Sequence, residues 1–425
     1  MTTELDQPRV AVVGGGWAGC SAALTLAEAG VAVTLFEASR TLGGRARAVE
    51  LEGQPLDNGQ HILLGAYEQS LQLIERLHPV TPLWRLPLTL EQPPAFSLTC
   101  PRLPAPLHVL AGLLGARGLN WREKLAAAHW AHTMLRDTAT PGQLTVSQLT
   151  RTQPEKLRNA LWHPLCVSAL NTPPELADAR IFRSVIRAAF GGRTHHSDLI
   201  LPRHDLTALL PAPAAARVVE LGGDIRLGHR VTTLDVTPNA IALGNHGDMA
   251  VFSHVILAVA PQHLPALAKQ VPALGPLGHT VAGYEYQPIA TAYMQYDPDF
   301  RLPGPLFALA NGPAQFVFDR GQSHGQAGLL AFVASAATNL PADWLDQAEA
   351  QLRRIVQPGP TRWRKRIIEK QATYSCVPGL ARPPVHTPHP RIFLAGDYTA
   401  GPYPATLESA TQSGVQSAGA LLEQL

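Results

Sequence analysis

Three glycines and a glutamate occur in the order needed to hold a dinucleotide. Gly14, Gly16 and Gly19 have the spacing G-x-G-x-x-G, and Glu37 follows them. Gly14 allows a tight turn, Gly16 lets the backbone approach a pyrophosphate closely, and Gly19 allows a helix to pack against a strand. The Glu37 carboxylate can accept hydrogen bonds from both hydroxyls of an adenosine ribose, which argues against a 2′-phosphate. These residue types therefore indicate a dinucleotide site.

The surrounding sequence predicts the elements that must position these residues. The apolar run 10–13 predicts a buried parallel strand, the Ala/Leu-rich segment 18–29 a helix, and residues 31–36 a second strand that ends at Glu37. A helix that follows the glycines directs its N-terminal N–H groups at the phosphates. The alternative for the glycines alone is a turn without a ligand, but the flanking strand, helix and strand favour a nucleotide site.

The residues after the second strand favour FAD over NAD. Gly44 and Arg45 follow in the run Leu-Gly-Gly-Arg at 42–45 and are placed to close over the same pyrophosphate. Arg45 would supply a charge-assisted contact. The spacing R-x-x-G-G-R at 40–45 resembles that of the flavin amine oxidase and phytoene desaturase superfamily. FAD is therefore the expected cofactor.

The same resemblance returns at the C-terminal end of the chain, in residues 391–399 and 404–414. It implies that Gly396 permits close approach of the flavin and that Asp397 accepts from the ribitol chain. A helix that starts near Pro404 would offer its free N–H groups to the flavin. The residues at the start of this helix are Thr406 and Leu407. The backbone of Val231 matches the position that meets the adenine in these enzymes.

Segments in the middle of the chain resemble the squalene-associated branch of the superfamily, which includes the hydroxysqualene dehydroxylases. The matching segments are residues 57–67, 162–173 and 197–203. The resemblance implies reductive removal of the allylic hydroxyl of hydroxysqualene to give squalene, in squalene and hopanoid biosynthesis. The flavin would carry the hydride, and the protein would supply geometry and one proton.

His61 is the first candidate for the proton donor. Gly59, Gln60 and His61 match the superfamily segment that passes beside the flavin ring, and imidazole titrates near neutral pH. Asp57 and Asp198 are the reserve candidates for catalysis. Two alternatives stay open: His61 only hydrogen-bonds the cofactor or the backbone, and Asp57 has a structural role.

The fold expected is α/β, with a Rossmann-like FAD-binding domain of the glutathione-reductase and amine-oxidase type and a discontinuous α+β substrate domain. The FAD-binding domain is expected to comprise residues 1–65, 200–265 and 380–425, and the substrate or lid domain residues 66–199 and 266–379. Within the latter we expect antiparallel strands at 287–296, 315–318, 329–334 and 362–373, and helices at 120–136 and 342–356.

Composition and sequence patterns argue against several other classes of protein. The 425 residues are 46% hydrophobic and 16% charged, with a net charge of +2, so nothing indicates nucleic-acid binding. The four cysteines lie far apart without a C-x-x-C pair, so neither a metal site nor a disulfide scaffold is expected. No signal peptide and no membrane-spanning run of about 18 to 20 apolar residues is found, which favours a cytoplasmic protein.

Residues 101–115, with Arg117 and Arg122 just beyond, could lie in a membrane surface. This would place the protein peripherally on the inner face of the cytoplasmic membrane, where a squalene-like lipid resides. The alternative is a helix that packs in the core through one face. The residues of that face would be Leu107, Leu110, Leu113 and Leu114.

Other functions stay open. A carotenoid desaturase of the phytoene type would use the same FAD motifs in the oxidative direction. A soluble amine oxidase is disfavoured because such enzymes usually need aromatic residues beside the amine and only 6% of residues are aromatic. A non-catalytic isoprenoid carrier would lack flavin. Only one dinucleotide fingerprint is present, so an electron-donor protein is a possible partner.

Overall fold

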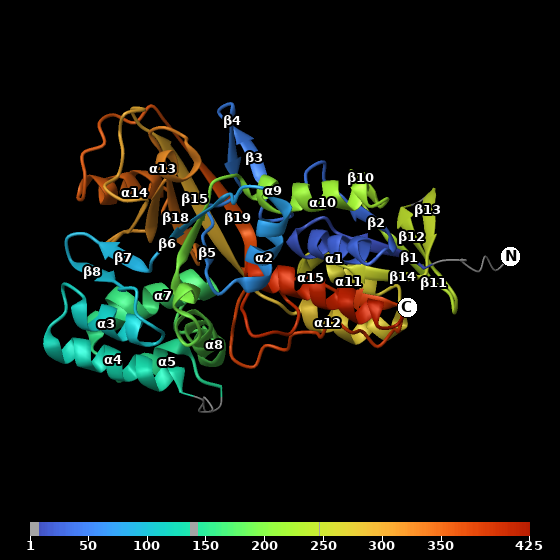
Figure 1. Cartoon of the computed structure of the whole chain (residues 1–425), viewed down its shortest axis with the longest axis horizontal. Helices are drawn as coiled ribbons and strands as arrows, with labels where there is room; N and C mark the ends of the chain where they lie inside the picture. The colour runs from blue at the N-terminus through green and yellow to red at the C-terminus, as the bar shows by residue number, and fades with distance from the viewer. Residues whose placement is uncertain (1–7, 137–142, 246) are drawn as a thin grey trace.

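A parallel five-stranded sheet forms the centre of the nucleotide-binding half (Figure 1). The computed structural model describes residues 8–136, 143–245 and 247–425. The strand order is β10-β2-β1-β14-β20, and all four pairings in this sheet are parallel. The strands are β1 (Arg9–Val13), β2 (Ala32–Glu37), β10 (Asp224–Leu227), β14 (His254–Leu257) and β20 (Ile392–Leu394). Three distant parts of the chain therefore contribute to one sheet.

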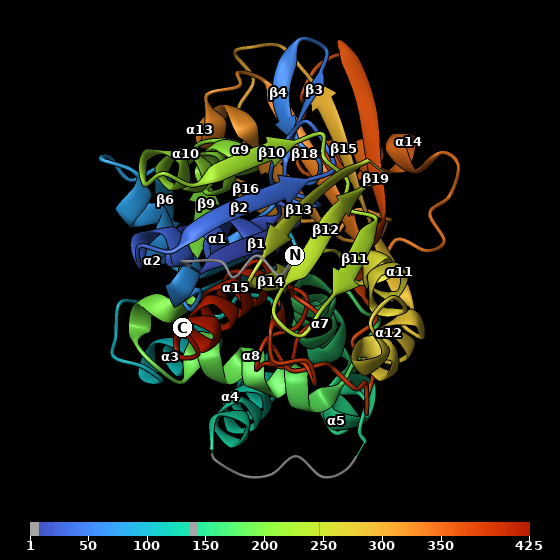
Figure 2. The same cartoon turned by 90° about the vertical axis from the view of Figure 1, so that its right-hand side faces the viewer.

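Helices α1 (Trp17–Glu28), α10 (Pro211–Glu220) and α15 (Leu407–Leu422) pack together beside this sheet. Small side chains let α1 and α15 approach closely, since a Cβ on Gly414 would lie 2.2 Å from the Ala18 carbonyl oxygen. A three-stranded antiparallel sheet follows β10 in the chain (Figure 2). Its strands are β11 (Thr233–Val236), β12 (Ile241–Asn245) and β13 (Asp248–Phe252).

The second half contains an antiparallel sheet of order β16-β17-β18-β15-β19. Its strands are β15 (Tyr286–Gln295), β16 (Leu306–Ala308), β17 (Phe316–Asp319), β18 (Leu329–Ser335) and β19 (Trp363–Tyr374). Helix α14 (Trp344–Arg353) buries Trp344 in the apolar cluster on one face of this sheet. Each strand expected from the sequence here is observed within two residues of its predicted ends.

The helices of residues 107–190, which lie between β2 and β10 in the sequence, gather at one end of the molecule (Figure 1, lower left). They are α3 (Leu107–Gly115), α4 (Trp121–Leu135), α5 (Val146–Thr150), α6 (Glu155–Leu157), α7 (His163–Leu170) and α8 (Ala179–Phe190). The predicted capping box of α4 is confirmed: Asn120 Oδ1 accepts from the Glu123 N–H at 3.0 Å, and Glu123 Oε2 accepts from the Asn120 N–H at 2.8 Å.

Shorter elements join these layers. The strands are β3 (Ala48–Leu51), β4 (Gln54–Asp57), β5 (Leu63–Leu64), β6 (Leu83–Leu86), β7 (Thr89–Gln92), β8 (Phe96–Thr99) and β9 (Leu199–Pro202). The helices are α2 (Glu68–Leu77), α9 (Leu206–Leu209), α11 (Leu264–Ala268), α12 (Gly275–Ala282) and α13 (Arg320–His324). Single turns of other helix types are Arg158–Trp162, Thr194–Ser197, Pro261–His263 and Pro272–Leu274.

Two helices differ in detail from what the sequence suggests. Helix α15 begins at Leu407, not near Pro404, because Thr406 Oγ1 caps it by accepting from the Ser409 N–H at 3.1 Å. The alternative of a core-facing side of α3 holds only in part: Leu113 is buried, whereas Leu107 and Leu114 are 54% and 48% exposed.

Among the described residues, no helix is long and apolar enough to cross a bilayer. The four cysteines are free and buried. The expectation of no signal peptide depends largely on residues 1–7, which lie outside the described residues.

Candidate active site

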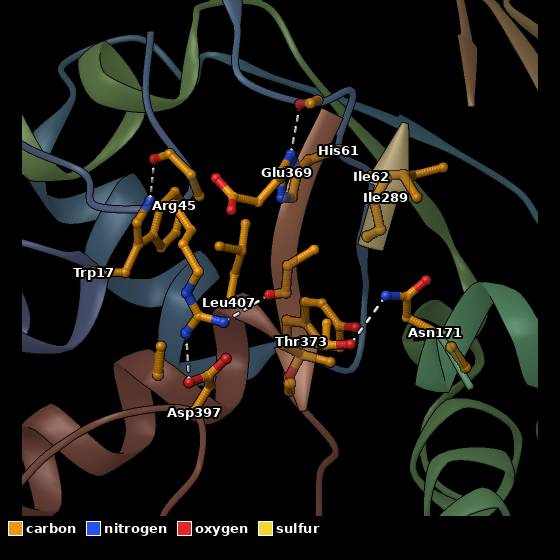
Figure 3. Close-up of a pocket in the computed structure, with 18 of the residues that line it drawn as sticks. Trp17, Arg45, His61, Ile62, Asn171, Ile289, Glu369, Thr373, Asp397 and Leu407 are labelled. Atoms are coloured by element: carbon orange, nitrogen blue, oxygen red, sulfur yellow. Dashed lines mark hydrogen bonds and ion pairs between the residues drawn. The ribbon is translucent and has the colours of Figure 1, made fainter. Parts of the chain in front are cut away.

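A cavity of about 910 Å³ runs between the nucleotide-binding half and the helices at the far end. This volume lies near the top of the range of about 300–1,000 Å³ seen for small-molecule sites. One end is lined by the glycine-rich turn after β1, and the other by apolar residues of α3, α4 and α8. Figure 3 shows the middle section, where both halves contribute side chains.

The three glycines after β1 differ in what surrounds them. Gly14 has φ +113°, and a Cβ there would lie 2.4 Å from the Ala258 carbonyl oxygen. A Cβ on Gly19 would lie 1.8 Å from the Gly14 oxygen. Around Gly16 the space is open, since its nearest neighbour is the Gly44 Cα at 4.0 Å. Gly14 and Gly19 therefore serve the turn and the packing, and Gly16 and Gly44 leave room for a phosphate group on the cavity side.

The far end of β2 suits an adenosine. Glu37 is held by the N–H groups of Gly15 and Ser39, each 2.7 Å from one of its carboxylate oxygens. Val231 and Gln262 line the same end of the cavity. The buried Oε1 of Gln262 has no hydrogen-bond partner among the described residues, so a donor such as the adenine amine would satisfy it. The residues here fit the adenosine half of FAD.

Arg45 contacts the C-terminal part of the site (Figure 3). Its Nη2 donates to Asp397 Oδ1 at 2.7 Å, and its Nη1 donates to the Ala372 carbonyl at 2.6 Å. Arg45 therefore forms an ion pair with Asp397 at the cavity wall, and its expected contact with a pyrophosphate stays a prediction. This pair fixes Asp397 beside Leu407, where a ribitol chain would pass.

The N-terminus of α15 also lines the cavity, through Thr406 and Leu407. The first N–H groups of a helix have no partner within the helix, so they can donate to a bound group. Gly396, just before this segment, has φ +155°, and a Cβ there would lie 2.4 Å from the Tyr398 ring. A glycine is therefore required for the chain to turn into the site.

Gly59, Gln60 and His61 line the middle of the cavity. His61 Nδ1 lies 2.7 Å from the Gly59 carbonyl oxygen, so this nitrogen carries the proton when the ring is neutral. Burial lowers the pKa of His61 below its usual value, although the Gly59 carbonyl and Asp57 act in the opposite direction. The imidazole is consequently mostly neutral at pH 7.

The two reserve carboxylates lie outside the cavity wall. Asp57 is buried, and its carboxylate accepts from the Leu206 N–H at 2.7 Å and from Arg320 at 3.2 Å. Asp198 forms a partly exposed ion pair of 3.3 Å with Arg85. Neither carboxylate is placed to touch a bound substrate, so the geometry favours the structural alternative for Asp57.

Sequence reasoning missed Glu369, a carboxylate that lines the cavity near Arg45 (Figure 3). The Asn58 side-chain amide donates to Glu369 Oε2 at 3.1 Å and to the Arg45 carbonyl at 3.2 Å. Side chains alternate between the two faces of a strand, so Ile367, Glu369 and Gln371 share a face of β19. That alternation in the predicted strand was the signal that could have found it.

The end of the cavity away from the glycines is apolar. Trp130 of α4 and Trp162 line it with their ring centroids 4.3 Å apart. The other apolar residues there include Leu98, Val109, Leu113, Leu161, Val185, Ile186 and Phe190. Such a surface can shelter a hydrocarbon chain next to the cofactor-binding middle section.

The fold and the cradle define an FAD-dependent oxidoreductase. The model of the family described as flavin containing amine oxidoreductase matches residues 17–422, and the chain belongs to this family. It is 25% identical to the hydroxysqualene dehydroxylase of Sinorhizobium fredii, covering 98% of both chains, and 28% identical to that of Zymomonas mobilis, covering 96% and 97%. A putrescine oxidase variant has a similar structure, with a TM-score of 0.75, 18% identity and 99% coverage of both chains.

Proposed function

We propose that this protein is a hydroxysqualene dehydroxylase that forms squalene in squalene and hopanoid biosynthesis. The main support is the continuity of the cavity from the FAD cradle to the apolar end beside Trp130 and Trp162. The hydrocarbon chain of a C₃₀ isoprenoid would occupy this apolar end, and its reacting carbon would lie in the middle section of the cavity, next to the cofactor. The full-length similarity to proteins named hydroxysqualene dehydroxylase agrees with this substrate.

Bound reduced FAD supplies a hydride in this chemistry. The allylic C–O bond breaks, the hydroxyl takes one proton and leaves as water, and the hydride completes the new C–H bond. The protein must hold the allylic carbon at the cofactor, exclude bulk water and deliver that proton. His61 and Glu369 are two titratable side chains that line the cavity, and we assign the donor role to protonated His61.

Single-turnover chemistry tests the function directly. The purified protein is reduced without oxygen and mixed with hydroxysqualene, while flavin absorbance is followed and the lipid is extracted. Flavin reoxidation with one squalene formed per flavin is expected. If hydroxysqualene does not reoxidise the reduced flavin but a polyene reduces the oxidised flavin, the result would instead support a carotenoid desaturase. A purified protein without flavin would support an isoprenoid carrier.

We expect the dehydroxylation rate to fall as pH rises through the lowered pKa of His61, that is, below pH 6.5. The reason is that only the protonated ring can donate from Nε2 while Nδ1 is bound to Gly59. His61→Gln should remove this pH dependence and slow the reaction about 100-fold. The rate of flavin reoxidation, followed by stopped flow between pH 5 and 8, measures both effects. If instead Glu369→Gln removes the dependence of the rate on pH while His61→Gln retains it, Glu369 is the donor.

We also propose that the outer surface of α3 and α4 docks on a membrane. The supporting residues are large, apolar and exposed, with Arg117 and Arg122 nearby. They are Leu103 (41% exposed), Leu107 (54%), Leu114 (48%), Trp121 (66%) and Leu125 (53%). The inner surface of the same helices lines the apolar end of the cavity. A lipid could therefore enter from the bilayer without crossing water.

Leu107→Glu together with Leu114→Glu should weaken binding to anionic vesicles about ten-fold or more, since each change removes an exposed leucine that would enter the bilayer. Sedimentation with vesicles of phosphatidylglycerol and phosphatidylcholine measures this. Val219→Glu is the matched control, because Val219 is 55% exposed on α10. Equal loss of binding in both proteins, or no loss in the double variant, would contradict docking through α3.

We infer that the electrons come from a separate donor protein. The support is the single G-x-G-x-x-G fingerprint, which the adenosine end of the FAD cradle already uses. NADH or NADPH alone should therefore leave the flavin oxidised under anaerobic conditions. Rapid bleaching by either nucleotide would contradict a separate donor.

A further inference from the structure

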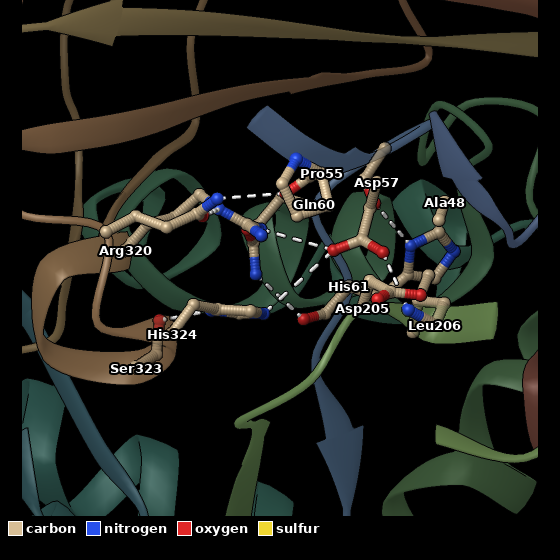
Figure 4. Close-up of polar contacts among 12 residues, drawn as sticks. Ala48, Pro55, Asp57, Gln60, His61, Asp205, Leu206, Arg320, Ser323 and His324 are labelled. Atoms are coloured by element: carbon tan, nitrogen blue, oxygen red, sulfur yellow. Dashed lines mark hydrogen bonds and ion pairs between the residues drawn. The ribbon is translucent and has the colours of Figure 1, made fainter. Parts of the chain in front are cut away.

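A buried polar network lies directly behind the cavity-lining segment 58–61 (Figure 4). Its centre is Arg320, the first residue of α13, whose side chain is 1% exposed. Arg320 Nη1 donates both to Asp57 Oδ2 at 3.2 Å and to Gln60 Oε1 at 2.7 Å. The guanidinium also lies over the Tyr293 ring, 5.7 Å from its centroid. One side chain from the antiparallel-sheet half therefore binds Gln60 of the cavity-lining segment and Asp57, which directly precedes the segment.

Asp57 is fixed from several directions. Its second carboxylate oxygen accepts from the Leu206 N–H at 2.7 Å, and its backbone carbonyl accepts from the Tyr293 hydroxyl at 2.8 Å. The buried His324 ring lies next to it, with Nε2 4.0 Å from Asp57 Oδ2. Burial, together with the charge of Arg320, lowers the pKa of His324 to about 3, so this ring is neutral and leaves Arg320 as the cation that pairs with Asp57.

Gln60 connects Arg320 to the residues that line the cavity. Its side-chain oxygen is held by Arg320, and its side-chain nitrogen donates to the His61 carbonyl at 3.1 Å. Its backbone N–H reaches Thr291 Oγ1 at 3.4 Å. The backbone that bears the His61 ring is thus anchored on both sides of Gln60.

We propose that Arg320 is a positioning residue that acts through Gln60 and Asp57 to hold segment 58–61 against the bound flavin. Arg320 does not line the cavity, so it has no direct contact with the reacting atoms. Arg320 uses two of its nitrogens, because Nη1 donates to Asp57 and Gln60 while Nε donates to Gln326 Oε1. The single ammonium group of lysine cannot reproduce this spread of donors. The network links the two halves of the molecule at the point where the cofactor and the substrate must meet.

The test compares Arg320→Lys, Gln60→Met and the double variant as flavin-loaded proteins. We expect each single variant to change the visible absorption spectrum and midpoint potential of the flavin. Each should slow single-turnover dehydroxylation about ten-fold at saturating lipid, with a smaller effect on the lipid concentration needed for half-saturation. The double variant should be no more affected than the worse single variant, because both changes break the same link.

Arg301→Lys is the matched control, since Arg301 is exposed and bonds the carbonyls of Pro298 and Phe300. A lower melting temperature of Arg320→Lys with an unchanged flavin spectrum, potential and rate would overturn the proposal and leave a purely structural role. Additive effects in the double variant would also overturn it. If Arg320→Lys does not fold, the measurements on Gln60→Met test the proposal by themselves. This variant retains the buried ion pair of Arg320 with Asp57 and is expected to fold.

The rate measurement rests on the proposed function, whereas the spectrum and the potential require only bound flavin. A protein that fails to reduce hydroxysqualene would refute the proposed function. The flavin measurements would still accept or reject the role of Arg320.

Discussion

Gly16→Val should abolish flavin binding while leaving the apoprotein folded. Gly16 has φ −76° and ψ −177°, a conformation that valine adopts readily, and a Cβ there would meet no atom closer than the Gly44 Cα at 4.0 Å. The valine side chain would occupy the space between Gly16 and Gly44 that a pyrophosphate needs. We expect the flavin dissociation constant to rise about 100-fold or more, roughly 3 kcal/mol. Fluorescence titration of the apoprotein with FAD measures it.

Two other glycines supply the controls for this prediction. Gly275→Ala should bind flavin normally, because a Cβ at Gly275 would have no neighbour within 4 Å. Gly19→Val should fail to fold, because its Cβ would lie 1.8 Å from the Gly14 oxygen. Normal flavin binding by Gly16→Val would show that the cradle is not where the pyrophosphate lies. An unfolded Gly16→Val would show that Gly16 has a packing role.

Asp57→Asn should destabilise the protein by about 3–5 kcal/mol, because it leaves the buried Arg320 guanidinium without its counter-charge. The shape of the side chain is conserved, so no cavity forms. The loss comes from the missing charge and from an amide nitrogen that must face either the Leu206 N–H or the Arg320 guanidinium. Chemical denaturation of the apoprotein, followed by circular dichroism at several denaturant concentrations, measures the free energy of unfolding.

Asp198→Asn is the matched control, because it changes the same group in the partly exposed pair with Arg85. The Arg85 and Asp198 side chains are 40% and 17% exposed, so water screens their attraction and the expected loss is at most about 1 kcal/mol. Similar losses in the two variants would mean that the Asp57–Arg320 pair contributes no more than a surface pair.

The cofactor half of the site was predictable because its determinants are local. The glycine motif, the two flanking strands and Glu37 lie within one short stretch, and each has a steric or hydrogen-bonding task that the residue type reveals. The model of the flavin containing amine oxidoreductase family, matched from residue 17 to 422, and the parallel sheet confirm the expected class of fold. Arg45 shows the limit of this reasoning, since its partner Asp397 lies 352 positions away.

The substrate half was less predictable because its contacts are long-range. Nothing near Asp57 in the sequence indicates a partner such as Arg320, which lies 263 positions away. Helix α3 is apolar on most sides, so the spacing of Leu107 and Leu114 could not show which side faces the core. The packing of α3 against α4 decides it, and this turns Val109 and Leu113 inward.

The ion pair between Arg45 and Asp397 also affects the order of events during synthesis. At about 5–20 residues per second, the ribosome needs roughly 20 to 70 s to make the 352 positions between these two residues. β20 is made only at the end of this interval, so β14 is an open edge of the parallel sheet from its own synthesis until then, and α1 lacks its partner α15 throughout. The nascent chain therefore exposes an unpaired strand edge and one side of α1 until its last segment emerges.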